Sequence, residues 1–188
     1  MTPLAPHITA FFEQRLPFER RASEHTRDSY AYAFKLFLTY ASTRLKVTPS
    51  QLAVEQIDAP LVLDFLKHLE TTRGNSPNSR NIRLAAIKSF LHFLEYQEPS
   101  ALERIRRILA IPFKRTESRL VPYLSVEEMQ AILDAPTPTT WAGTRDRALL
   151  HLCYAGGLRV SELIGLRLDD LILQPNTRML SIVAKVLA

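Results

Sequence analysis

The sequence contains a single cysteine, Cys153, among its 188 residues. One cysteine excludes an internal disulfide framework and is typical of a reducing compartment. No run of about 18 apolar residues occurs, so the sequence predicts no membrane-spanning helix. Residues 1–20 lack the charged start and the apolar middle of a signal peptide. These absences predict a cytoplasmic protein with no membrane partner.

The sequence also lacks the signatures of metal, nucleotide and serine-nucleophile sites. The five histidines show no metal-ligand spacing, and no second cysteine is present to build a zinc site. The adjacent glycines Gly156 and Gly157 are not followed by Lys and Ser or Thr, which excludes a P-loop. No G-x-S-x-G motif occurs. We therefore expect no metal and no cofactor, and we expect any catalysis to rest on side chains alone.

Positive charge is concentrated in one segment. Residues 73–115 hold nine Lys and Arg against three Asp and Glu. Residues 1–72 are neutral, with eight of each sign, and residues 116–188 hold seven positive against eight negative residues. Clustered positive charge is typical of a protein that binds nucleic acid, although a solvated helix face has the same composition.

Apolar residues recur at helical spacing through the first 111 residues. One helix is predicted within residues 23–46. Asp58 with Pro60 marks the start of another, and a longer one follows the break at residues 71–80. The positions expected to face the core are Tyr30, Phe34, Phe37, Leu38, Ala41, Leu45, Val62, Phe65, Leu66, Leu69, Leu84, Ile87, Leu91 and Leu94. Residues 1–111 are therefore predicted to form an all-helical bundle of four or five short helices.

Residues 112–123 carry prolines, mixed charges and weak periodicity, which predicts an interdomain linker. Ser125 and Glu128 have the spacing of a capping box, so a second unit, residues 124–188, is predicted to begin with a helix. Residues 178–188 are β-branched and follow turn residues, which predicts one strand whose partner we do not expect within the chain. The predicted fold is mainly α, with a helical bundle followed by the first helices and one strand of an incomplete α+β domain.

An arginine opens a predicted helix directly after two glycines. Gly156 and Gly157 end the preceding helix, and Arg159 then lies in a first turn where the helix dipole disfavours a cation. The residues expected to anchor this helix are Val160, Leu163 and Ile164. Arg159 either pairs with Glu162 and does nothing else, or joins the helix N-terminus in holding an anion such as phosphate. The residues alone leave both interpretations open.

The motif around this arginine resembles that of a known family. RDRALLHLCYAGGLRVSELIGLRLDDL, residues 145–171, resembles the first catalytic box of tyrosine recombinases, the phage-integrase and Xer-type family. Gly156 stands where Thr or a similar small residue is usual. Upstream, HTRDSYAYAFKLFLTY (25–40) and SPNSRNIRLAAIKSFLHFL (76–94) resemble two helices of the family's SAM-like core-binding domain. The resemblance covers almost the whole chain.

The resemblance implies a mechanism and a site. The family cuts DNA through a 3′-phosphotyrosyl link without a metal, and Arg159 matches its first phosphate-binding arginine. Lys185 matches the family's general acid toward the leaving 5′-oxygen, although Ala184 and Val186 replace the usual flanking glycines; a solvent-facing strand lysine is the alternative. The nucleophilic tyrosine would lie beyond Ala188. We therefore expect the chain to be inactive alone.

The resemblance implies double-stranded DNA as the partner and allows a homo- or hetero-oligomer on that DNA. The residues expected to bind DNA are Arg27, Ser76, Arg80, Arg83, Lys88, Lys114 and Arg115. The predicted function is site-specific recombination or integration by a tyrosine recombinase, here as a fragment that binds DNA and lacks the nucleophile. A non-catalytic DNA-binding module and a helical DNA-binding regulator are the alternatives.

Overall fold

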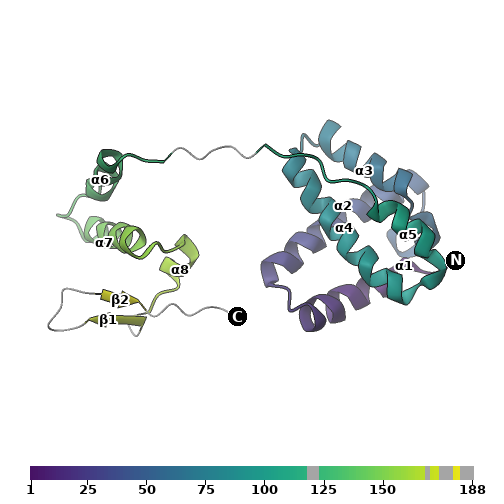
Figure 1. Ribbon diagram of the computed structural model, residues 1–188, viewed down its shortest axis with the longest axis horizontal. Helices are drawn as coiled ribbons and strands as arrows, with labels where there is room; N and C mark the ends of the chain where they lie inside the picture. The colour runs from purple at the N-terminus through teal and green to yellow at the C-terminus, as the bar shows by residue number, and fades with distance from the viewer. Residues whose placement is uncertain (118–122, 168–169, 174–179, 183–188) are drawn as a thin grey trace. The chain divides into compact units, whose positions relative to one another are not determined.

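The structure, a computed structural model, describes residues 1–117, 123–167, 170–173 and 180–182. The chain divides into two compact units, Met1–Ser118 and Arg119–Ala188 (Figure 1). The helices of the first unit are α1 (Leu4–Ala10), the π-helical segment η1 (Phe11–Glu19), α2 (Glu24–Leu45), α3 (Ala59–Thr71), α4 (Pro77–Gln97) and α5 (Leu102–Leu109). Short 3₁₀ turns lie at Pro49–Gln51, Val54–Gln56 and Pro99–Ala101.

Local capping determines where the longer helices begin. Ser23 caps α2, Asp58 caps α3 and Ser76 caps α4. Each side chain accepts from a backbone N–H three residues on, as in the 2.9 Å bond from Leu61 N to Asp58 Oδ1. Such a cap stabilises a helix by about 1 kcal/mol. The predicted start at Asp58 is confirmed.

The apolar faces of α2, α3 and α4 meet in one core, as the periodicity predicts. The fully buried members of the expected set are Phe34, Phe37, Ala41, Val62, Phe65, Leu66, Leu69, Leu84, Ile87, Leu91 and Leu94. The remaining three, Tyr30, Leu38 and Leu45, are partly buried and pack against the same core. The predicted helical bundle is therefore confirmed, and α2 and α4 lie side by side within it (Figure 1).

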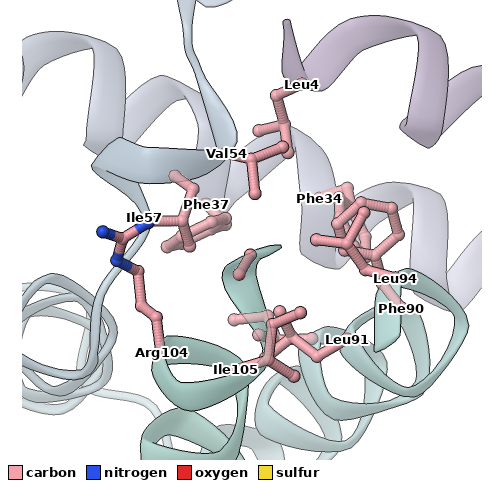
Figure 2. Close-up of a pocket in the computed structure, with 12 residues that line it drawn as sticks. Leu4, Phe34, Phe37, Val54, Ile57, Phe90, Leu91, Leu94, Arg104 and Ile105 are labelled. Carbon is pink, nitrogen blue, oxygen red and sulfur yellow. The ribbon is translucent and has the colours of Figure 1, made fainter. Parts of the chain in front are cut away.

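A small void remains inside this core. Its volume is about 20 Å³, and its lining is apolar apart from Arg104 at the edge (Figure 2). That volume holds about one water molecule. The void is therefore a packing imperfection and offers no room for an organic ligand.

The described part of the second unit contains three helices and two short strands. These are α6 (Val126–Asp134), α7 (Trp141–Gly156), α8 (Val160–Ile164), β1 (Leu171–Leu173) and β2 (Leu180–Ile182). The predicted capping box is confirmed, because Ser125 N donates to Glu128 Oε2 at 2.8 Å and Glu128 N donates to Ser125 Oγ at 3.2 Å. Arg147 on α7 pairs with Asp134 at the end of α6 at 2.7 Å.

The prediction of one strand without a partner in the chain is wrong. Strand β2 pairs antiparallel with β1, in a register that places Leu171 opposite Ile182 and Leu173 opposite Leu180. The periodicity argument missed β1 because three apolar residues are too few to show the alternation of a strand. Among the described residues, no helix is long and apolar enough to cross a lipid bilayer.

Candidate functional site

A tight turn between α7 and α8 presents Arg159. Gly157 adopts the left-handed conformation, with φ of 60°, and its N–H donates to the carbonyl of Cys153. Leu158 N donates to the same carbonyl at 3.2 Å. Glycine takes this conformation at no steric cost, so it ends α7 and reverses the chain. Arg159 then occupies the N-cap position of α8.

The Glu162 carboxylate accepts hydrogen bonds from both the backbone and the side chain of Arg159. Its Oε2 accepts from the Arg159 backbone N–H at 2.7 Å, and its Oε1 accepts from Arg159 Nη1 at 2.9 Å. The backbone N–H bond, followed by the guanidinium bond, holds the pKa of the Glu162 carboxyl below its usual range. The Arg159 side chain nevertheless remains 82% exposed. An exposed ion pair of this kind is weak and screened by salt, so the guanidinium is accessible to a stronger anion.

Two further expectations concern the anchors of α8 and the general acid. The expectation that Val160 and Ile164 anchor α8 is wrong, because they are 71% and 77% exposed. Leu163, the third expected anchor, is half-buried. Lys185, the expected general acid, lies outside the described residues.

Two of the cations expected to bind DNA contact the end of α5 and the segment that follows it. Arg80 is only 5% exposed, and its Nη1 donates to the carbonyl of Pro112 at 3.2 Å. Lys88 Nζ donates to the carbonyl of Leu109 at 2.7 Å and lies 4.8 Å from the Phe113 ring centroid. Burial lowers the pKa of the Lys88 ammonium, and the positive charge of Arg80 lowers it further. Both side chains therefore have structural contacts that their sequence spacing did not indicate.

Asn81 on α4 fixes the same segment through two backbone hydrogen bonds. Its Nδ2 donates to the carbonyl of Lys114 at 2.7 Å, and its Oδ1 accepts from Lys114 N at 3.0 Å. The Lys114 ammonium pairs with Glu70 of α3 at 2.7 Å, whereas Arg115 is exposed. The first residues of the expected linker are therefore bound to the helical unit. No sequence signal identified Asn81, because its partner lies 33 residues away.

Of the other expected DNA-binding residues, Ser76 and Arg83 lie at the N-terminal part of α4, and Arg27 lies in the N-terminal part of α2. Ser76 is the N-cap of α4. Arg83 is half-buried, with its guanidinium 4.8 Å from the Tyr32 ring centroid and its Nη1 3.4 Å from the carbonyl of Ser29. Arg73, in the turn before α4, donates to the Tyr32 hydroxyl at 3.4 Å. Arg27 of α2 is half-buried. We refer to Tyr32, Arg73 and Arg83 as the Tyr32 cluster; Tyr32 and Arg73 were not among the residues expected from the sequence.

Comparison with known proteins assigns family models to both units. Residues 9–98 match the family described as "Phage integrase, N-terminal SAM-like domain", and residues 122–185 match the "Phage integrase family". No solved structure gives a significant match. Within the described residues, no group of three or more His, Cys, Asp or Glu is placed to hold a metal ion.

Three curated relatives are similar to nearly the whole chain. The integrase/recombinase y4rC of Sinorhizobium fredii is 46% identical over 168 residues, which cover 89% of this chain and 51% of the relative. The integrase/recombinase y4rD of the same organism is 39% identical, covering 91% of this chain and 61% of the relative. The tyrosine recombinase XerC of Myxococcus xanthus is 36% identical, covering 91% and 53%. The chain thus spans between one half and about three-fifths of the length of these relatives.

Proposed function

Because the chain belongs to the phage integrase family of tyrosine recombinases, we propose that it serves site-specific DNA recombination or integration. In this proposal the helical unit binds duplex DNA, and the second unit supplies Arg159 to the phosphate that is cut and rejoined. The proposed place of action is the cytoplasm, and assembly of more than one protomer on the DNA is part of the proposal.

The observation that carries the proposal is the presentation of Arg159. Phosphoryl transfer builds negative charge on the non-bridging oxygens, and preorganised donors stabilise that charge. Arg159 projects from a sharp turn with an 82% exposed side chain, while Glu162 fixes its backbone. The planar guanidinium can donate two parallel hydrogen bonds to a phosphate, which a lysine cannot do. Both geometry and family position therefore support Arg159 as a phosphate ligand.

Lys185 remains part of the proposal through its place in the family motif. A lysine at that position would protonate the leaving 5′-oxygen, which a general acid must do as the phosphodiester bond breaks.

For DNA binding, the proposal assigns different roles to the expected cations. Arg27, Arg83 and Arg115, with Ser76 at the start of α4, are proposed to face the phosphate backbone. Their side chains have no carboxylate partner among the described residues. Arg80 and Lys88 are proposed to act indirectly, because they donate to carbonyls at the end of α5 and in the segment after it. Lys114 is proposed to act indirectly because its ammonium pairs with Glu70.

The test of Arg159 needs a complete catalytic domain. Residues 1–188 can be joined to the remainder of Myxococcus xanthus XerC, which matches this chain over 171 residues. On a nicked substrate that traps the covalent intermediate, Arg159→Lys should reduce strand cleavage about 10²-fold or more, the scale for losing one preorganised donor. Arg167→Lys is the matched control, because Arg167 is an exposed arginine of the same unit. Equal cleavage by the Arg159→Lys protein and the parent would contradict the proposed role.

A further inference from the structure

We propose that Tyr32 orients Arg73 and Arg83 into a paired binding surface for the phosphates of one DNA strand, an inference that rests on the proposed DNA binding. The three side chains come from separate segments of the helical unit. Tyr32 is on α2, Arg83 is on α4, and Arg73 is in the turn between α3 and α4. Their convergence is a product of the fold, because 41 residues separate Tyr32 from Arg73.

The contacts of Tyr32 orient both guanidinium groups. The Arg83 guanidinium carbon lies 4.8 Å from the centroid of the ring, at the distance of a cation–π contact. A guanidinium held by its face keeps N–H groups at its edge for other acceptors. Arg73 Nη2 lies 3.4 Å from the Tyr32 hydroxyl. One side chain, which is itself 45% exposed, thus orders two cations at the surface.

The charges of the cluster are not neutralised by the protein. Among the described residues, neither Arg73 nor Arg83 forms an ion pair with a carboxylate, whereas Lys114 pairs with Glu70 and Arg147 pairs with Asp134. The Nε atom of Arg83 is buried and has no hydrogen-bond partner among the described residues. Two ordered, uncompensated guanidinium groups favour an anionic ligand with more than one acceptor group.

A further arginine without a carboxylate partner among the described residues lies near the start of α2. Arg27, also on α2, has a buried Nε without a partner among the described residues. Of the acidic residues nearest in sequence, Glu24 lies in the first turn of α2, where the helix dipole favours negative charge, and neither Glu24 nor Asp28 forms an ion pair among the described residues. Arginines on α2 and α4, two helices that pack together, suit a ligand with several phosphates such as a nucleic-acid backbone.

The chemistry of the cluster indicates backbone contact rather than base reading. The Arg83 guanidinium covers one face of the Tyr32 ring, so that face is not free to stack on a base. Contacts to phosphates position a protein on DNA and carry little sequence information. The cluster should therefore contribute equally to binding of different duplex sequences.

The test measures the affinity of the 188-residue chain for a labelled duplex at several salt concentrations. Arg83→Ala should weaken binding about tenfold and should reduce the salt slope by about one, because one phosphate contact is lost. Tyr32→Leu should weaken binding by a similar factor with an almost unchanged slope, because both charges remain and only their orientation is lost. Tyr96→Leu is the matched control, since Tyr96 is 80% exposed on the opposite end of α4.

Coupling between the residues separates a positioning role from an additive one. The double variant Tyr32→Leu with Arg83→Ala should bind less than twofold more weakly than Tyr32→Leu alone, because Tyr32→Leu already removes the phosphate contact of Arg83. Tyr32→Phe removes only the hydroxyl, so it should weaken binding slightly and make a further Arg73→Ala change nearly silent. The variants Tyr32→Phe and Arg73→Ala keep the proposal testable if circular dichroism shows that Tyr32→Leu does not fold.

Each contrary result has a distinct meaning. Normal binding by Tyr32→Leu, with Arg83→Ala impaired, would overturn the positioning role of Tyr32. Normal binding by Arg73→Ala and Arg83→Ala, in a chain that still binds DNA, would overturn the phosphate surface and leave the proposed function intact. Failure of the unmodified chain to bind any duplex would overturn the proposed DNA binding itself. Tighter binding of an acidic peptide than of duplex DNA would also overturn the inference, because it would change the partner.

Discussion

Arg159 and Glu162 form a unit in which one carboxylate serves both the backbone and the side chain of one residue. This arrangement offsets the unfavourable position of a cation at a helix start. It also leaves the guanidinium exposed, so the structural pairing and the proposed phosphate contact are compatible. The two interpretations that the sequence left open are therefore not exclusive. Glu162 orders the residue, and a phosphate can replace one of its two hydrogen bonds.

The titration of Glu162 tests this unit at residue scale. Its pKa lies below the ordinary value of 4.5, chiefly because the Arg159 backbone N–H donates to the carboxylate. A carboxyl with a depressed folded-state pKa stabilises the fold fully above the unfolded value and loses that contribution as the pH falls through the folded value. The capping of α8 should therefore persist at pH 4.5 and be lost only at lower pH.

Carbon-detected NMR of the Glu162 carboxyl measures the midpoint directly. In Arg159→Ala the midpoint should rise, because the guanidinium is lost, but it should stay below 4.5, because the backbone donor remains. A midpoint at or above 4.5 in the unmodified chain would show that the Glu162 contacts do not form in solution.

At the scale of elements, α4 links the core to the segment that leaves the helical unit. One side of the helix buries Leu84, Ile87 and Leu91, and another holds the chain after α5 through Arg80 and Asn81. The two bonds between Asn81 and the Lys114 backbone resemble one rung of a β-ladder. The direction in which the chain leaves this unit is thus set by side chains 33 residues earlier.

Asn81→Ala should release this segment without unfolding the bundle. Two hydrogen bonds that each contribute about 1 kcal/mol would be lost, so local opening should become about tenfold or more favourable. Limited trypsin digestion should then cut after Lys114 and Arg115 correspondingly faster, while the circular dichroism of the bundle stays unchanged. Asn78→Ala, at an exposed position one turn earlier, is the control. Equal cleavage rates in Asn81→Ala and the parent would show that these bonds do not hold the segment.

The same scale shows what the sequence could and could not predict. The starts at Asp58 and Ser125 depend on groups three residues apart, so local patterns identified them. The core positions of α2, α3 and α4 followed from helical periodicity. The burial of Arg80 depends instead on a carbonyl 32 residues away. Strand β1 was not predicted because its three residues are too few to show the alternation of a strand.

The candidate site also contains residues that the sequence could predict and residues that it could not. Arg159 was found from its motif, and its pairing with Glu162 follows from their i, i+3 spacing. Of the Tyr32 cluster, only Arg83 was expected from the sequence, because Tyr32 and Arg73 are brought to it only by the packing of the helical unit. Arg80 and Arg83 were both expected to bind DNA, but the chain after α5 covers Arg80. A basic residue on a helix surface is therefore accessible to DNA only if no later segment of the chain packs over it.

At the scale of the whole molecule, the chain carries a net charge of +5, and the segment from residue 73 to 115 supplies more than this excess. Part of that charge is used within the protein, by Arg80, Lys88 and Lys114. Arg27, Arg73, Arg83 and Arg115 form no ion pair among the described residues, and we propose that they supply the charge that a duplex meets. Binding should therefore depend on particular arginines as well as on net charge.

The most direct test of this account is the affinity of the 188-residue chain for duplex DNA as a function of salt, measured by fluorescence anisotropy. Counterion release predicts a steep, linear fall in the logarithm of the association constant between roughly 50 and 200 mM salt. The double change Arg27→Glu with Arg83→Glu should weaken binding strongly and flatten this slope. Arg106→Glu with Arg107→Glu, an equal charge change on α5, should weaken it much less. Affinity that does not change with salt, or equal losses in the two double variants, would contradict a DNA-binding surface built around α2 and α4.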